Sequence, residues 1–159
     1  MAAPKRNKFA DCPKIDNWPE YIVKDFSSER EMCDYIDTFA QLFAEDILEC
    51  RYEGHSREYV LEGSNPRKPG PRVDFVFNNE DGIILVECKN VTQTYNELVA
   101  SIGQLLSYII LAEKSGRKVK RSCLVVSSFI GVIDDIINRY NLPIDVFIFS
   151  KNQVLKLMN

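Results

Sequence analysis

The stretch RVDFVFNNEDGIILVECKN, residues 72–90, sets two β-strand patterns on either side of a turn sequence. Val, Ile and Phe dominate both halves, Arg72–Asn78 and Ile83–Lys89. Between them, Asn79-Glu80-Asp81-Gly82 has the residue types that favour a tight reversal of the chain. The sequence therefore predicts a β-hairpin, and the rest of the fold has to be built around it.

The length of the turn decides which side chains meet across this hairpin. A four-residue loop at 79–82 sets Asp74 directly opposite Glu87. A two-residue loop at Asp81-Gly82 would set Asp74 opposite Lys89, with Glu87 still on the same face. A three-residue loop without a bulge would put Asp74 and Glu87 on opposite faces. We predict the four-residue loop.

The predicted pairing brings charged groups together. Because side chains alternate along a strand, Glu87 and Lys89 share one face while Cys88 points the other way. Opposed carboxylates destabilise a strand pair unless something neutralises them, and a divalent cation would do so. Mg²⁺ prefers carboxylates, waters and phosphate oxygens, and the backbone carbonyl of Cys88 could add another hard oxygen. Lys89 could then hold an attacking water or offset charge on a phosphate.

Asp74, twelve intervening residues and then Glu87-Cys88-Lys89 together resemble the PD-(D/E)xK nuclease superfamily. The proline that often precedes the aspartate is not adjacent here, since the nearest is Pro71. The resemblance implies a restriction-endonuclease-like core and a nuclease that depends on Mg²⁺ or Mn²⁺, with Asp74 and Glu87 as metal ligands. The alternative interpretation of the same residues is a solvated, salt-bridged hairpin end.

A long helix is predicted from Tyr95 to Ser115, with apolar residues at helical spacing. Gln104 and Tyr108 lie one turn apart on one face of it, which by itself is an ordinary helix-surface pair. Behind the hairpin motif, however, QxxxY resembles the branch of the superfamily that includes RecB-like nucleases and related phage and viral enzymes. That resemblance implies that Gln104 and Tyr108 line the active site.

The first predicted helix begins near Ser28, where Ser28-Glu29-Arg30-Glu31 has a capping pattern, and runs to about Cys50. Its polar face is acidic. The superfamily commonly places one glutamate of its first helix beside the metal, and the resemblance therefore implies that Glu45 adds a ligand. Glu49, one turn later, is the alternative.

Composition narrows the class of protein. With 159 residues, of which 45% are hydrophobic and 27% charged, the chain is expected to form one domain over 28–159 behind an irregular arm at 1–27. Five cysteines lack metal-knuckle spacing and are expected to be thiols in a reducing compartment. No apolar run approaches the length of a membrane span, so we expect a soluble, intracellular protein, in the cytoplasm or in a host cell if it is viral.

A net charge of −3 argues against a protein that coats nucleic acid through bulk electrostatics. The basic residues are nevertheless clustered. One cluster precedes the hairpin and the other follows the long helix; the candidates for phosphate contacts are Arg67, Lys68, Arg72, Lys118 and Lys120. The alternative is a solvated charged face.

Four further elements complete the expected order: a strand at 58–62, a strand at 121–127, a helix at 129–140 and a strand at 144–150. A terminal strand or helical turn is expected at 152–157. This order predicts an α/β domain with a mixed sheet, in which strands are added to an antiparallel meander through helical crossovers. The site is expected at a sheet edge.

The function that these patterns favour is a metal-dependent DNA endonuclease. An exonuclease, a Holliday-junction resolvase or an RNase could use the same site. A nuclease-fold module that binds nucleic acid or a partner protein without cutting is the alternative from another class. A homodimer is expected as the simplest source of affinity and of two-strand cutting.

Overall fold

The computed structural model describes residues 26–62, 67, 70–128, 130–150 and 153–156. Lys68 and most of the expected N-terminal arm lie outside these residues. Within them, no helix is both long and apolar enough to cross a membrane.

The described strands form one mixed sheet of six, in the spatial order of the chain. They are β1 (His55–Val60), β2 (Arg72–Asn79), β3 (Gly82–Lys89), β4 (Val119–Val126), β5 (Asp145–Ser150) and β6 (Gln153–Lys156). The first three are antiparallel, β4 and β5 are added in parallel, and β6 turns back antiparallel on β5. The predicted meander with helical crossovers is confirmed, and the terminal segment is a strand.

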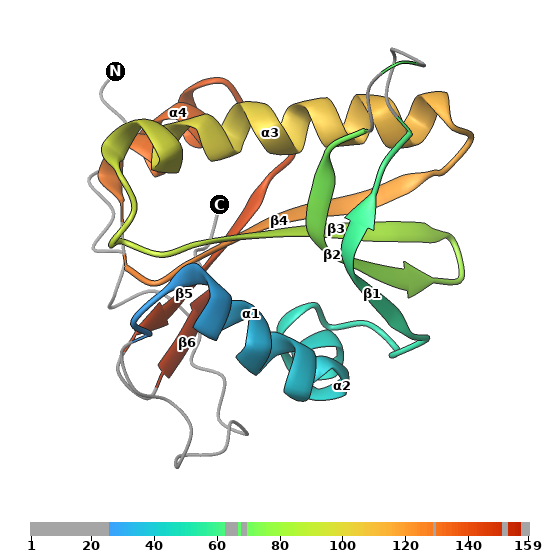
Figure 1. Ribbon diagram of the computed structural model, residues 1–159, viewed down its shortest axis with the longest axis horizontal. Helices are drawn as coiled ribbons and strands as arrows, with labels where there is room; N and C mark the ends of the chain where they lie inside the picture. Colours follow the sequence, from blue (N-terminus) through green and yellow to red (C-terminus); the bar gives the residue numbers. More distant parts are fainter. Residues whose placement is uncertain (1–25, 63–66, 68–69, 129, 151–152, 157–159) are drawn as a thin grey trace.

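Helices cover both faces of this sheet (Figure 1). They are α1 (Glu29–Thr38), α2 (Ala40–Leu42), a π-helical turn η1 (Phe43–Ile47), α3 (Tyr95–Lys114) and α4 (Gly131–Arg139). Residues of α1 and η1 pack with Phe75 and Phe77 in one core, and residues of α3 and α4 pack with Val76 and Leu85 in the other. Because neighbouring residues of β2 and β3 point to opposite faces, one hairpin anchors both cores.

The first helix starts as predicted but is shorter. Ser28 caps it by accepting a hydrogen bond from the N–H of Glu31 at 3.1 Å. Instead of continuing to Cys50, α1 ends at Thr38, and the chain proceeds through α2 and η1. The apolar spacing does not reveal this break, because Phe43 and Ile47 after it are buried in the same core as the residues before it.

The hairpin has the predicted register with a shorter loop. Asn78 pairs with Ile83, and Asn79 pairs with Gly82, so the loop is Glu80-Asp81 alone. Gly82 has φ +154°, and a Cβ there would lie 2.3 Å from the backbone oxygen of Lys118. Glycine is therefore required at this position by both conformation and space.

β1 begins earlier than predicted, at His55. Its imidazole lies 2.7 Å from the Tyr52 hydroxyl and 2.7 Å from a carboxylate oxygen of Asp37. These two partners hold the ring against α1, and they explain why a turn-like sequence starts a strand.

Candidate functional site

The backbone ladder between β2 and β3 stops one step before the two predicted metal ligands. Its last pair is Phe75 with Val86, and Asp74 and Glu87 follow. There the N–H of Cys88 donates to Oδ2 of Asp74 at 2.8 Å, and the N–H of Asp74 lies 3.5 Å from Oε2 of Glu87. Side chains thus occupy the opening between two interior strands, and the prediction of a site on a sheet edge is wrong.

A third carboxylate comes from α1. Oxygens of Glu29, Asp74 and Glu87 all lie within 4.8 Å of one another, a spacing that a single cation could bridge. Glu29 is the first residue of α1. The segment before it is tied to the end of the hairpin, because the buried Asn90 donates from Nδ2 to the carbonyl of Phe26 at 3.0 Å.

Lys89 lies against this group. Its Nζ is 3.4 Å from Oε1 of Glu87 and 3.9 Å from Oε2 of Glu29. The side chains of Lys89 and Glu87 are only 9% and 5% exposed. When all are ionised, three carboxylates and one ammonium leave a formal charge of −2 in a place with little water. Carboxylate oxygens are the donors that Mg²⁺ and Mn²⁺ prefer, and a divalent cation matches the excess charge.

The pKa values of this group reflect its burial. Burial raises the pKa of Asp74 to about 6, and burial followed by the charge of Asp74 raises the pKa of Glu87 to about 8. Burial lowers the pKa of Lys89, but the neighbouring carboxylates, Glu87 foremost, more than offset this and raise it. At neutral pH the group therefore retains a proton on a carboxylate unless a cation replaces it.

The structure also brings Tyr108 to the carboxylates. Tyr108 is buried, and its pKa is raised by burial and then by the charges of Glu87, Asp74 and Glu29. Gln104, one turn earlier, is partly buried, and its Oε1 has no hydrogen-bond partner among the described residues. A role for this pair in the site stays a prediction.

The glutamates predicted from the first helix are elsewhere. Glu45 lies in η1, is exposed, and accepts a hydrogen bond from Nε2 of Gln41 at 3.1 Å. Glu49 is exposed beyond η1. The break after Thr38 separates both from the first turn of α1, and Glu29 takes the place assigned to them. In the sequence Glu29 is visible only as part of the capping pattern.

The basic residues do not converge on the carboxylates. Lys118 and Lys120 flank Val119, which pairs with Ile83 at the start of β3, whereas Glu87 and Lys89 lie at its end. Arg72 is exposed at the start of β2, and Arg67 is exposed before it. Arg72 is two positions before Asp74 in the sequence. The phosphate contacts of Arg67 and Arg72 stay a prediction.

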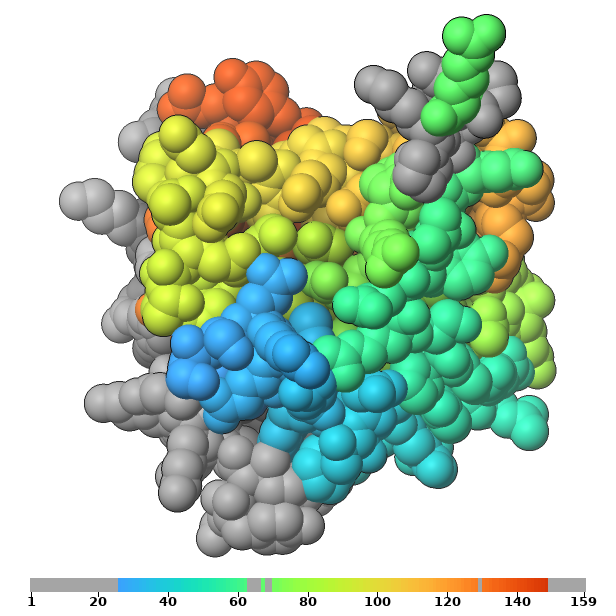
Figure 2. Space-filling view, viewed as in Figure 1, coloured from blue at the N-terminus to red at the C-terminus, as the bar shows by residue number. Residues whose placement is uncertain are grey.

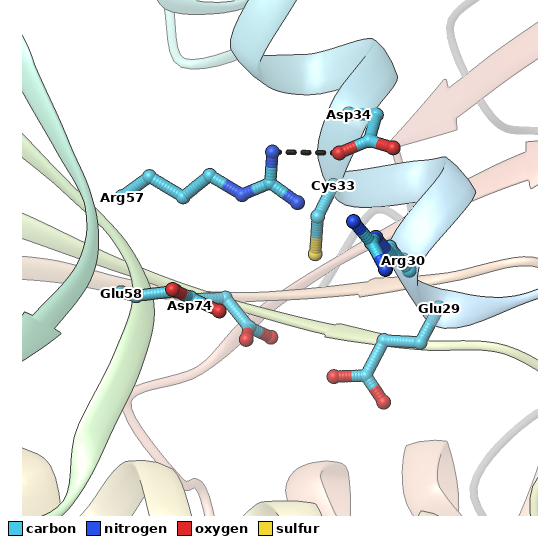
Figure 3. A pocket seen from close by; sticks show the side chains of 7 residues that line it. All are labelled: Glu29, Arg30, Cys33, Asp34, Arg57, Glu58 and Asp74. Carbon is cyan, nitrogen blue, oxygen red and sulfur yellow. Dashed lines mark ion pairs between the residues drawn. The ribbon is translucent and has the colours of Figure 1, made fainter.

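A cavity of about 610 Å³ opens beside Asp74 (Figure 3). It is lined by Glu29, Arg30, Cys33, Asp34, Arg57, Glu58 and Asp74. On the surface in Figure 2, α1 in blue lies between α3 in yellow and the green strands of the hairpin region. Arg57 is held by Asp34, with 2.7 Å between NH1 and Oδ1. No sequence pattern indicates that Arg30 and Arg57 line the same cavity as Asp74.

No family model and no curated protein matches this chain. Its three-dimensional arrangement is similar to a repair endonuclease from Pyrococcus abyssi, with 21% identity and a TM-score of 0.46 over 76% of this chain and 47% of that one. It is also similar to an XisH family protein from Nostoc punctiforme (12% identity, TM-score 0.46, 67% of this chain and 88% of that one). The small subunit of a heterodimeric restriction endonuclease follows at 13% identity and a TM-score of 0.42, over 77% and 72% of the two chains. This chain thus spans about half the length of the first of these proteins.

Proposed function

We propose that this protein hydrolyses phosphodiester bonds in nucleic acid and uses a divalent cation, Mg²⁺ or Mn²⁺, to do so. The observation that carries the proposal is the group formed by the partly buried Glu29 and Asp74 and the buried Glu87, with Lys89 at 3.4 Å from one of its oxygens. In a salt-bridged hairpin end each carboxylate would have its own cation, whereas here Lys89 is shared by Glu87 and Glu29.

In this proposal Asp74, Glu87 and Glu29 hold the cation, and the carbonyl of Cys88 offers a further oxygen. The bound cation would supply positive charge to the phosphate oxygens and lower the pKa of a water. The N–H of Cys88 fixes the Asp74 carboxylate through their 2.8 Å hydrogen bond. Lys89 orients the attacking water or offsets the charge that develops on the phosphate.

Tyr108 and Gln104 shape the wall that α3 presents to the substrate. The raised pKa of Tyr108 keeps its hydroxyl protonated, so that it can donate a hydrogen bond to a phosphate or sugar oxygen. The Oε1 of Gln104, which has no partner among the described residues, can accept one. Arg67, Lys68 and Arg72 would contact phosphates outside the cleaved bond. Lys118 and Lys120 could do so only for a substrate that extends along β3, since Ile83 and Glu87 are roughly 13 Å apart along a strand.

DNA cut at internal positions is the proposed substrate. Purified protein should be incubated with linear and circular DNA, single-stranded, double-stranded and branched, and with RNA, in Mg²⁺, Mn²⁺ or EDTA. We expect cleavage of circular DNA that EDTA abolishes. Cleavage of free ends alone would indicate an exonuclease, cleavage of branched DNA alone a resolvase, and cleavage of RNA alone an RNase. Binding without cleavage in any cation would contradict an enzyme and favour a binding module.

A homodimer is part of the proposal, because two copies of one site can cut both strands of a duplex. Light scattering of the free and the DNA-bound protein measures it directly. A monomer in both states would contradict the dimer and favour nicking or single-strand cutting.

A further inference from the structure

Asp74 belongs to two groups of potential ligands. Besides the three carboxylates, a carboxylate oxygen of Asp74 and the sulfur atoms of Cys33 and Cys88 all lie within 4.8 Å of one another. Cys33 stands one helical turn after Glu29 on α1, and Cys88 follows Glu87 on β3. Each cysteine therefore comes from the same element as one of the carboxylates, and Asp74 lies between the two groups.

The two thiols differ in access. Cys88 is fully buried, and Cys33 is buried but lines the 610 Å³ cavity. Figure 3 shows the Cys33 sulfur pointing into this cavity, toward Asp74 and Glu29. Both cysteines are free thiols. An ion that enters through the cavity would meet Asp74 and Cys33 first and then Cys88 behind them.

The geometry points to a second cation site, formed by Cys33, Cys88 and Asp74, that binds a thiophilic divalent ion such as Zn²⁺. Thiolates select ions of this kind, whereas three carboxylates select Mg²⁺ or Mn²⁺. Tetrahedral Zn²⁺ with Zn–S bonds of about 2.3 Å holds two sulfurs about 3.8 Å apart, which is within the present spacing. The cavity can supply a water as the fourth ligand.

Binding of the ion at this site exchanges protons for the ion. A cysteine binds such an ion as the thiolate, so each thiol gives up its proton. When the ion binds, two S–H bonds are replaced by two bonds to the ion, and two protons leave to solvent. Affinity should therefore rise with pH.

Occupation has a consequence for the other site, and this part rests on the proposed function. Because Asp74 is common to both groups, a thiophilic ion bound to it either takes this ligand from the hard ion or shares it and repels that ion at close range. A thiophilic ion should thus inhibit the enzyme that Mg²⁺ or Mn²⁺ supports.

Cd²⁺ tests the site without any assay of cleavage, because cadmium thiolates absorb in the near ultraviolet. The full chain, kept reduced with a phosphine, should show this absorption and saturate at one equivalent. Cys33→Ala and Cys88→Ala should each reduce it at least tenfold in affinity. Cys123→Ala is the matched control, since Cys123 is buried in the same core on β4 but outside the group, and it should keep the band. No band in the parent protein, or a band that survives both of the first two variants, overturns the proposal.

Glu87→Gln distinguishes the two sites without changing either cysteine, so its result does not depend on whether a cysteine variant folds. This change removes a ligand of the carboxylate group only, so the Cd²⁺ band should persist while Mn²⁺ affinity, measured by electron paramagnetic resonance, falls at least tenfold. In the parent protein, one equivalent of Cd²⁺ should weaken Mn²⁺ binding at least tenfold. Undisturbed Mn²⁺ binding overturns the competition. A protein that shows the band and the competition but cuts no substrate contradicts the nuclease proposal and leaves the site standing.

Discussion

A lysine–carboxylate pair lies at each end of the β2–β3 hairpin, and the two pairs differ in their exposure to water. At the turn, Nζ of Lys120 lies 3.8 Å from Oδ2 of Asp81, and these side chains are 40% and 70% exposed. At the open end, Lys89 and Glu87 are 3.4 Å apart and are 9% and 5% exposed. Water screens the first pair, so its contribution to stability is small. The second pair is desolvated and shares its space with two more carboxylates, so it is costly unless a further positive charge arrives.

This difference teaches that burial, and not residue type, separates a screened surface pair from a desolvated one. The residue types at the two ends are the same. What differs is the burial: α1 and α3 pack on opposite faces of the sheet, and the side chains of Lys89 and Glu87 keep little contact with water.

The largest difference between the two ends is expected in the rate of cleavage, and Lys89→Ala tests it. If the ammonium acts on the attacking water or the phosphate, cleavage should fall on the order of 10²–10³-fold, while Mn²⁺ affinity and nucleic-acid binding largely remain. Lys120→Ala, the lysine at the other end, should change turnover less than twofold. Unchanged turnover in Lys89→Ala would remove the proposed mechanism.

The second effect is on stability and pH. The ordinary pKa values of Asp74 and Glu87, 3.8 and 4.5, rise to about 6 and about 8 in the folded protein. Over that window the folded chain holds protons that the unfolded chain has released, so stability in EDTA should fall as pH rises from about 5 to 8. The loss should be on the order of 5 kcal/mol, because each group loses about 1.4 kcal/mol per pH unit until its folded-state pKa is reached.

Urea unfolding at a series of pH values measures this loss. Glu87→Gln should flatten the dependence, because its amide does not titrate. Glu45→Gln, which alters an exposed carboxylate, should leave the slope as it is. The same slope in parent and Glu87→Gln would mean that the pair does not titrate in this window.

Glu29→Gln should sharpen the comparison by testing the third carboxylate. Loss of one of three acidic ligands should weaken Mg²⁺ or Mn²⁺ binding about tenfold, which corresponds to about 1.4 kcal/mol. Glu45→Gln should bind the cation like the parent protein. Calorimetric titration measures both, and equal affinities in the two variants would show that α1 contributes no ligand.

The smallest effect is expected at the turn. Asp81→Asn and Lys120→Ala should each change the free energy of unfolding by less than about 0.5 kcal/mol, since exposed pairs contribute little. Added cations should not alter this result. A loss of more than about 1 kcal/mol at physiological salt would mean that the exposed pair is not screened as described.

Much of this hairpin could be predicted because its signals are local. Strand pattern and turn residues specify the pairing of Asn78 with Ile83, and that pairing carries Asp74 to Glu87. The loop is shorter than predicted because Asn79 and Gly82 pair with each other. Both are residue types that are common in turns, so the sequence does not show that they belong to the strands.

The third carboxylate could not be predicted, because its place depends on contacts between distant parts of the chain. Glu29 reaches the site because the segment at Phe26 is tied to Asn90, which directly follows the hairpin and lies 64 positions after Phe26 in the chain. The predicted Glu45 assumed an unbroken helix. The break after Thr38 leaves the apolar spacing unchanged, since Phe43 and Ile47 beyond it are buried in the same core, so the sequence pattern does not reveal it.

The measurement that tests the central claim most directly is a comparison of melting curves for the parent protein and Asp74→Asn, each in EDTA and in Mg²⁺ or Mn²⁺. The parent should gain stability as RT ln(1 + [L]/Kd), about 2.7 kcal/mol at one hundred times Kd, and the variant should gain little. In EDTA the variant should be as stable as the parent or slightly more so, because it relieves repulsion with Glu87 and its amide oxygen can still accept from the N–H of Cys88. If Asp74→Asn is instead markedly destabilised in EDTA and the parent does not respond to cations, the Asp74 carboxylate is a structural acceptor for the N–H of Cys88 and the metal site does not exist.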